Sequence, residues 1–274
     1  RSRGLGDVYK RQLLSLLVFL RRDIIGLIRI FFGLFSRFRR SEDDPYRKWL
    51  FYLIAASIPT FLMGYFFSGF FESLFDSLRT VGLALIGTGI FIWLTRFSRP
   101  RTRPKLSHSL AIGIFQGAAI IPGLSRSGLT IGSALLMGWP REEATRFSFM
   151  LSVPVIFGAS VFQMSRIDLA DQNWALIIIG LLSAAAVGWG ALVFLSALVK
   201  KGKFHVFAYY CLPVGLAALV IIIKFTVRRR RPPGEWGSIY RNTDPHSFPS
   251  GHAARASMLA TIALLIGPLW LGIL

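Results

Sequence analysis

Long apolar stretches alternate with short polar segments along most of this chain. A helix needs roughly 20 residues to cross about 30 Å of hydrocarbon. Six stretches come close to that length: 49–67, 81–97, 147–164, 174–199, 205–223 and 253–274. Because only helices and closed barrels satisfy their backbone groups in lipid, this pattern predicts an all-α fold. We expect a polytopic membrane protein with roughly six to seven spanning helices.

The first 35 residues do not follow this pattern. Residues 1–12 are polar and have no apolar period, and they are interpreted either as a non-native leader or as a short basic tail. Residues 13–20 are apolar but too short to span, which is typical of the last third of a truncated helix. Residues 24–35 are also too short, and we expect them to lie in the membrane interface.

The apolar stretch at 108–138 is interrupted in its middle by the sequence PGLSRSG, residues 122–128. Each flanking half is too short to cross a membrane alone. Irregular backbone at membrane depth is tolerated only where it is buried in protein or lines a water-filled cavity. This segment therefore predicts a re-entrant helical hairpin, with one kinked spanning helix as the alternative.

The charges of the loops favour the hairpin. Basic loops lie at 37–48, 95–105 and 200–203, whereas the loops at 68–79 and 165–173 are acidic or neutral. Basic loops mark the cytoplasmic side of a membrane protein. Lys105 and Arg146 then lie on the same side, so the segment between them must cross an even number of times, as a hairpin does.

Composition supports the membrane assignment and changes the meaning of the charge. Hydrophobic residues make up 53% of the chain, yet 32 Lys and Arg against 13 Asp and Glu give a formal net charge of +19. This hydrophobicity excludes a disordered chain and is too high for one soluble core. The charge is therefore interpreted as a topology signal, and no nucleic-acid partner is expected. The arginine run at 228–231 falls on the predicted outer face, where phosphate binding would explain it.

The interruption of the hairpin has the chemistry of an anion site. Pro122 and Gly123 end the first half-helix, and the second half-helix offers backbone N–H groups and a favourable dipole at its start. Arg126 adds a planar set of donors that matches a phosphate. The candidate catalytic residues here are Ser125 and Arg126, and the candidate phosphate ligands are Gln116, Gly123, Ser127 and Thr130. The alternative is that Arg126 pairs with Glu142 or Glu143 and holds the hairpin together.

The sequence QGAAIIPGLSRSGLT at 116–130 resembles the second signature of the bacitracin-resistance type undecaprenyl-diphosphatase family, and the similarity extends loosely over 13–223. The resemblance implies a plasma-membrane enzyme that removes a phosphate from undecaprenyl diphosphate and so recycles the lipid carrier of cell-wall peptidoglycan synthesis. It also implies that Arg126 binds the diphosphate, that Ser125 and Thr130 line the site, and that a divalent cation (Mg²⁺ or Ca²⁺) is a candidate cofactor. The family's glutamate-rich first signature is expected just upstream of residue 13.

A second pattern begins at Lys224. Six residues separate Lys224 from Arg231-Pro232, and sixteen more precede PSGH at 249–252. The pattern resembles the first two signatures of the type 2 phosphatidic acid phosphatase superfamily, whose third would fall beyond residue 274. Lys224 and Arg231 can clamp a phosphate, Ser250 and Gly251 can bind it at a helix start, and His252 can protonate a leaving oxygen. The alternative is a basic loop with a lone histidine.

Both patterns predict a phosphatase for lipid phosphates in the bacterial inner membrane, with its active site facing the periplasm. The expected domains are 13–223 and 224–274, joined either naturally or artificially, and the expected partners are a polyprenyl diphosphate and the bilayer. No metal ligand is predicted among these residues. Because each part lacks one signature of its family, we expect the 274 residues alone to have weak or no activity. The alternative function is a polyprenyl-lipid transporter or flippase, since broken helices also form the substrate sites of transporters.

Overall fold

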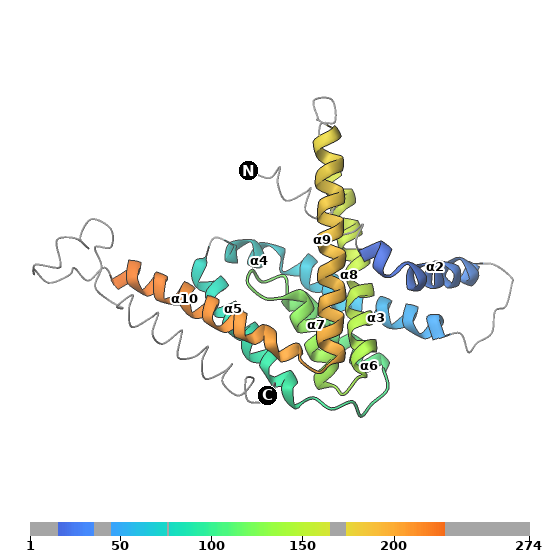
Figure 1. The fold of residues 1–274 in the computed structure, drawn as a ribbon, viewed down its shortest axis with the longest axis horizontal. Helices are drawn as coiled ribbons and strands as arrows, with labels where there is room; N and C mark the ends of the chain where they lie inside the picture. The colour runs from blue at the N-terminus through green and yellow to red at the C-terminus, as the bar shows by residue number, and fades with distance from the viewer. Residues whose placement is uncertain (1–15, 36–44, 76, 165–173, 228–274) are drawn as a thin grey trace, which may run out of the picture.

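The computed structural model describes residues 16–35, 45–75, 77–164 and 174–227, and all regular structure in this part is helical (Figure 1). The all-α prediction is therefore confirmed for the described residues. The α-helices are α2 (Arg21–Phe35), α3 (Pro45–Phe66), α4 (Ser68–Leu74), α5 (Leu78–Leu94), α6 (Leu106–Ala118), α7 (Arg126–Leu136), α8 (Arg141–Met164), α9 (Trp174–Lys200) and α10 (Ala208–Val227). Two short 3₁₀ helices, η1 (Thr95–Phe97) and η2 (Phe204–Phe207), adjoin α5 and α10.

Four helical segments are long and apolar enough to cross a membrane: Pro45–Phe66, Leu78–Phe97, Ile178–Lys200 and Phe204–Lys224. They correspond to four of the six predicted spans, so the polytopic membrane character is confirmed. The predicted span at 147–164 is part of α8, which begins at Arg141 because Glu142 and Glu143 occupy its first turn, where the helix dipole favours carboxylates. The stretch 253–274 lies outside the described residues.

The start of the described chain differs in part from the prediction. The sequence separated an apolar segment at 13–20 from another at 24–35, but α2 begins at Arg21 and residues 16–19 are also helical. Backbone hydrogen bonds of 2.9 Å join the two, from Leu20 N to Leu16 O and from Ile24 N to Leu20 O. A turn at Leu20 still separates residues 16–19 from α2, so the predicted division into two segments holds for the described residues, although the second segment begins at Arg21.

Two close helix pairs position the hairpin. Gly82 of α5 lies against Ala218 of α10, and Gly89 of α5 lies against Leu212, so these two helices run antiparallel. Helix α3 packs along α6 in the same direction, since Gly113 meets Ala56 and Gly117 meets Met63. Glycines at these contacts let the helix backbones approach closely. Both directions agree with the topology derived from the loop charges.

Candidate functional site

The segment predicted as a hairpin consists of two helices, α6 and α7, with a break at 119–125. The two ends of the segment lie together. The backbone N–H groups of Arg101 and Thr102 donate to the Gly138 carbonyl at 2.9 and 3.0 Å, and Trp139 Nε1 donates to His108 Nδ1 at 2.9 Å. One kinked helix would hold its ends far apart, so the structure favours the hairpin over that alternative.

The tip of the hairpin, residues 119–125, packs against the first turns of α5. Gly123 has φ of +96°, a conformation that side chains disfavour, and a Cβ there would lie 2.6 Å from the Val81 carbonyl oxygen. The backbone N–H of Ser125 donates to Thr88 Oγ1 at 3.2 Å, and Thr88 is buried in α5. Glycine and these contacts together fix where α7 begins.

Ser125 and Arg126 form the start of α7. Ser125 is its N-cap, and its hydroxyl accepts a hydrogen bond of 3.1 Å from Gly128 N. Arg126 is the first residue of the helix, and both Arg126 and Ser127 are half-buried. The predicted half-helix N-terminus is thus present, and it places a guanidinium and a hydroxyl in the first turn, where backbone N–H groups favour anions.

Thr130 lies one turn further along and is buried. Its hydroxyl donates to the Arg126 carbonyl at 2.9 Å and lies 2.5 Å from Ser148 Oγ of α8, a pair in which either hydroxyl can be the donor. Thr130 is 1% exposed and Ser148 is also buried. These contacts join α7 to α8, so in this structure Thr130 holds the helix that carries Arg126.

Gln116 lies in α6, one turn before the hairpin tip, and is only 2% exposed. Neither its amide nitrogen nor its carbonyl oxygen makes a hydrogen bond to another residue in the described part of the chain. An amide buried without partners is costly, and such groups in native proteins call for a ligand or an ordered water. Of the residues proposed from sequence, Gln116 has the clearest unmet hydrogen-bonding capacity.

The first turns of α5 bring a further cation close to this end of the hairpin. Two residues before Val81, Arg79 donates through Nη2 to Thr226 Oγ1 of α10 at 3.2 Å. Lys224 is half-buried in the last turn of α10. The hairpin tip and the end of α10 therefore meet the same end of α5. Arg79 was not predicted from the sequence, although it is the single basic residue of the predicted outer loop at 68–79.

The remaining predicted residues of the second pattern are Arg231, Ser250, Gly251 and His252, and they lie outside the described residues. Glu142, an alternative partner considered for Arg126, pairs with Lys200 Nζ at 2.6 Å. That ion pair joins the start of α8 to the end of α9. The hydrogen bond from Lys200 lowers the pKa of Glu142 below its ordinary value.

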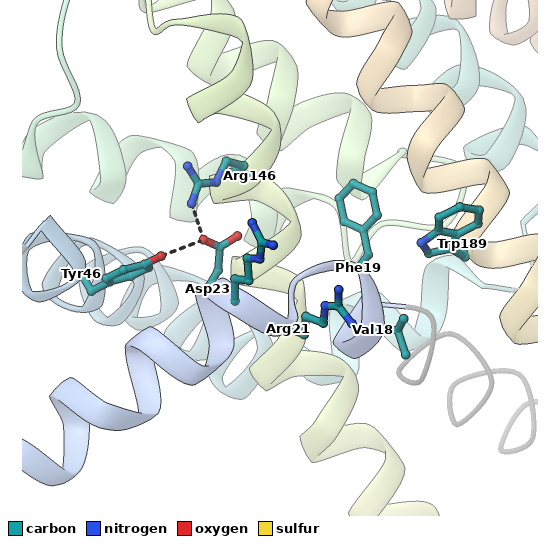
Figure 2. Close-up of a pocket in the computed structure, with 8 residues that line it drawn as sticks. Val18, Phe19, Arg21, Asp23, Tyr46, Arg146 and Trp189 are labelled. Atoms are coloured by element: carbon teal, nitrogen blue, oxygen red, sulfur yellow. Dashed lines mark hydrogen bonds and ion pairs between the residues drawn. The ribbon is translucent and has the colours of Figure 1, made fainter.

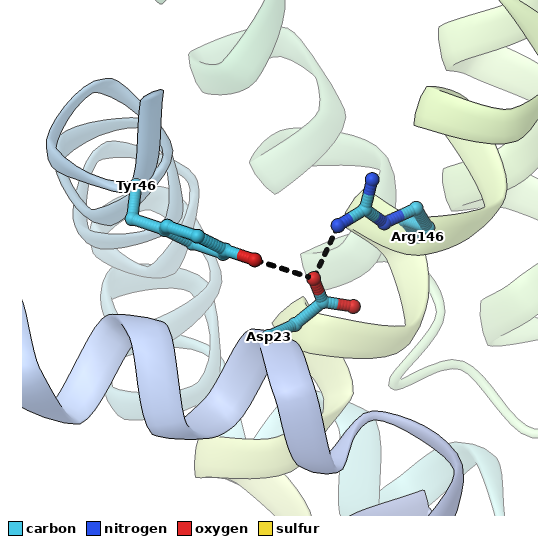
Figure 3. A network of polar contacts seen from close by, with 3 residues as sticks. All are labelled: Asp23, Tyr46 and Arg146. Carbon is cyan, nitrogen blue, oxygen red and sulfur yellow. Dashed lines mark hydrogen bonds and ion pairs between the residues drawn. The ribbon is translucent and has the colours of Figure 1, made fainter. Parts of the chain in front are cut away.

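A second polar cluster, also missed from the sequence, joins α2, α3 and α8 (Figures 2 and 3). The carboxylate of Asp23 accepts hydrogen bonds from Arg146 and, at 3.4 Å, from the Tyr46 hydroxyl. Asp23 is 8% exposed. The hydrogen bond with Asp23 raises the pKa of Arg146, which stays charged. A carboxylate close to the apolar run at 13–20 was the available signal.

A metal centre has no support among the described residues. They contain no group of three or more His, Cys, Asp or Glu side chains placed to hold a metal ion. The divalent cation implied by the family resemblance therefore remains a proposal.

A family profile and several known proteins indicate the same family for this chain. The family profile described as "Bacitracin resistance protein BacA" matches residues 11–217. A relative from Halothermothrix orenii is 40% identical over 183 residues, which is 64% of this chain and 71% of the relative. One from Korarchaeum cryptofilum is 32% identical over 78% of this chain and 83% of its own length. Another, from Methanothermobacter thermautotrophicus, is 42% identical over 61% of this chain and 97% of its own length. All three are named undecaprenyl-diphosphatase.

Proposed function

Because this chain belongs to the bacitracin resistance protein BacA family, we propose that it is an undecaprenyl-diphosphatase, a membrane hydrolase that converts undecaprenyl diphosphate to undecaprenyl phosphate. The observation that carries this proposal is the start of α7 at the hairpin tip, where the family match coincides with an N-terminus that bears Arg126. A diphosphate needs concentrated positive charge and N–H donors, and this turn supplies both.

In the proposed reaction, water attacks the terminal phosphorus of the diphosphate. A new P–O bond forms, the bridging P–O bond to the terminal phosphorus breaks, and its electron pair remains on the oxygen of the lipid monophosphate. Inorganic phosphate leaves with the oxygen of the water. Arg126 and the N–H groups of the first turn of α7 stabilise the negative charge of the transition state. Ser127 and the backbone at Gly123 hold the phosphates, and Ser125 orients the turn through its cap.

The proposed site lies in a re-entrant hairpin that opens toward the periplasm. This placement is supported by the tip's contact with the start of α5, which the loop charges assign to the outer side. From there the enzyme would act on lipid carrier released outside during peptidoglycan synthesis. The proposal includes six to seven membrane-spanning helices. It also includes a divalent cation bound by residues outside those described.

The second part of the proposal concerns residues 224–274, a partial type 2 phosphatidic acid phosphatase-like segment. Lys224 supports it, because this residue lies at the end of α10 that meets the start of α5, on the proposed outer side. Arg231 would complete the clamp, Ser250 and Gly251 would bind the phosphate, and His252 would act as the acid.

The test uses the full-length parent of this chain, purified in lipid nanodiscs, with undecaprenyl diphosphate as the substrate. Substrate affinity and inorganic phosphate release are measured for the wild type, Arg126→Ala, His252→Ala and Arg101→Ala, an exposed arginine of the basic loop. Removing one charge-stabilising donor costs about 10²–10³ in rate. We expect Arg126→Ala to release phosphate about 10²–10³ times more slowly and to bind the substrate more than tenfold more weakly. Arg101→Ala should match the wild type in both measurements. Lipid movement across vesicles without phosphate release would instead establish the transporter.

A further inference from the structure

A cavity of about 600 Å³ lies between the start of α2, the start of α3, α8 and α9 (Figure 2). None of its lining residues belongs to the hairpin or to the proposed phosphatase site. A cavity of this size is large enough for a ligand of several tens of atoms. It therefore needs an explanation separate from the diphosphatase reaction.

The polar wall of this cavity is positively charged. It contains three arginines, Arg21, Arg22 and Arg146, and one carboxylate, Asp23. That carboxylate is already shared between Arg146 and the Tyr46 hydroxyl (Figure 3). Arg21 and Arg22 are exposed and form no ion pair with a described carboxylate. Among the described residues, the wall thus presents two guanidinium groups without a carboxylate partner, which match a phosphate or another anion.

An apolar part of the lining adjoins these arginines. It is formed by Val18, Phe19 and Trp189. The ion pair between Glu142 and Lys200 sets a common level for α8 and α9. Arg146 is four residues from this level along α8 and Trp189 is eleven residues from it along α9. At 1.5 Å per residue these positions lie about 6 and about 16 Å away, so Trp189 lies about 10 Å further than Arg146 from that ion pair along the helices.

A cationic part and an aromatic part displaced along α8 and α9 fit an amphiphile with an anionic head. We propose that this cavity binds one anionic phospholipid, with its head-group phosphate on Arg21 and Arg22 and an acyl chain along Phe19 and Trp189. The start of α3 and the start of α8 lie on the side that the loop charges assign to the cytoplasm. Basic pockets between transmembrane helices on that side are suited to anionic lipid head groups.

The bound lipid also supplies contacts that α9 lacks. No residue in an apolar stretch of 18 residues within Ile178–Lys200 is buried against the rest of the protein. A lipid held between α2 and α9 covers part of that exposed surface and joins the two helices. Binding to the folded state alone raises stability, so the lipid is expected to raise the unfolding temperature. This proposal does not depend on the phosphatase function.

The test measures lipid binding to the full chain by native mass spectrometry, with phosphatidylglycerol against phosphatidylcholine. We expect the wild type to prefer phosphatidylglycerol. Each arginine near an anionic surface contributes about 1 kcal/mol, so the double variant Arg21→Gln/Arg22→Gln should bind phosphatidylglycerol about thirtyfold more weakly. The matched control is Arg101→Gln/Arg103→Gln, which removes the same charge from an exposed loop outside the cavity and should leave the preference unchanged.

Two further measurements complete the test. Trp189→Ala should weaken binding of phosphatidylglycerol but not of the soluble head-group probe glycerol phosphate, because only the acyl chain contacts the indole. Unfolding temperatures in phosphatidylcholine show that the variants remain folded. The proposal is overturned if the control double variant loses as much preference as Arg21→Gln/Arg22→Gln. It is equally overturned if inorganic phosphate alone occupies the site as tightly as the lipid, which would make this a free-anion site.

Discussion

At the scale of single residues, the side chain of Gln116 is better explained by a role in the proposed site than by a role in packing. Its side chain is buried, and neither polar atom is paired with a described residue. Leaving a buried amide unpaired costs about 1–3 kcal/mol. This cost is offset when a ligand forms hydrogen bonds with the amide. In the proposed reaction, that ligand is the diphosphate or the attacking water.

We predict that Gln116→Leu raises the unfolding temperature or leaves it unchanged, because leucine removes the unpaired amide at similar volume. The same variant should bind undecaprenyl diphosphate at least tenfold more weakly. Ile112→Val, one turn earlier on α6 and equally buried, is the control and should bind within twofold of the wild type. Normal substrate affinity in Gln116→Leu would show that the amide has no part in the site.

His108 gives a pH-dependent prediction. Its Nδ1 accepts the hydrogen bond from Trp139 and therefore must be unprotonated. Burial, and to a lesser extent the charge of Lys105, lowers the pKa of His108 below 6.5. The unfolded chain then binds a proton more readily than the folded one, so this contribution to stability is complete above about pH 6.5 and is lost as pH falls.

Unfolding temperatures of the wild type and His108→Gln, measured between pH 7.5 and 5.5, check this prediction. Glutamine keeps an acceptor for Trp139 but does not titrate. The wild type should lose a few degrees relative to His108→Gln as pH falls. A difference that stays constant with pH would mean that the imidazole does not titrate in this range.

At the scale of elements, the close contact of α3 and α6 holds the first half of the hairpin. A Cβ on Gly113 would overlap the carbonyl oxygen of Ala56, whereas a Cβ on Gly87 of α5 would meet no atom within 4 Å. Both glycines lie inside helices. They therefore form a matched pair in which the same substitution has opposite consequences.

We predict that Gly113→Ala lowers stability by about 1–3 kcal/mol, because the two helix backbones must separate. Gly87→Ala should raise it by up to about 1 kcal/mol, because alanine favours the helix. Denaturation in mixed detergent micelles measures both. If Gly113→Ala were as stable as Gly87→Ala, the close approach of α3 and α6 would not exist in the membrane.

At the scale of the whole molecule, the proposed topology assigns two loops to opposite sides of the membrane. Glu72 of α4 should face the periplasm and Arg101 the cytoplasm, and both residues are exposed. Cys211 is the single cysteine, and Cys211→Ser gives a background for labelling.

On that background, Glu72→Cys should react with a membrane-impermeant maleimide in intact cells, and Arg101→Cys only after lysis. The extent of labelling is read on a gel. Reaction of Arg101→Cys in intact cells would reverse the assigned orientation. The proposed periplasmic opening of the site would then be wrong as well.

Sequence alone determined the features that depend on local composition. Apolar length placed four spans close to their observed bounds, because backbone in lipid must be helical over about 30 Å. Pro122 and Gly123 predicted the break of the hairpin and the start of a second half-helix after it, which is α7. Helix length and helix breaks depend on residues that are neighbours in the sequence, so they can be predicted without knowing the tertiary contacts.

Only the tertiary structure decided which distant groups meet. Asp23 and Arg146 are 123 positions apart and read as unrelated charges, yet they pair where α2 crosses α8. Arg79 meets the end of α10 because α5 and α10 run antiparallel. Thr130 was expected to line the site and is buried against Ser148. Such contacts depend on helix direction and rotation, which packing determines, and hydropathy contains no information about either.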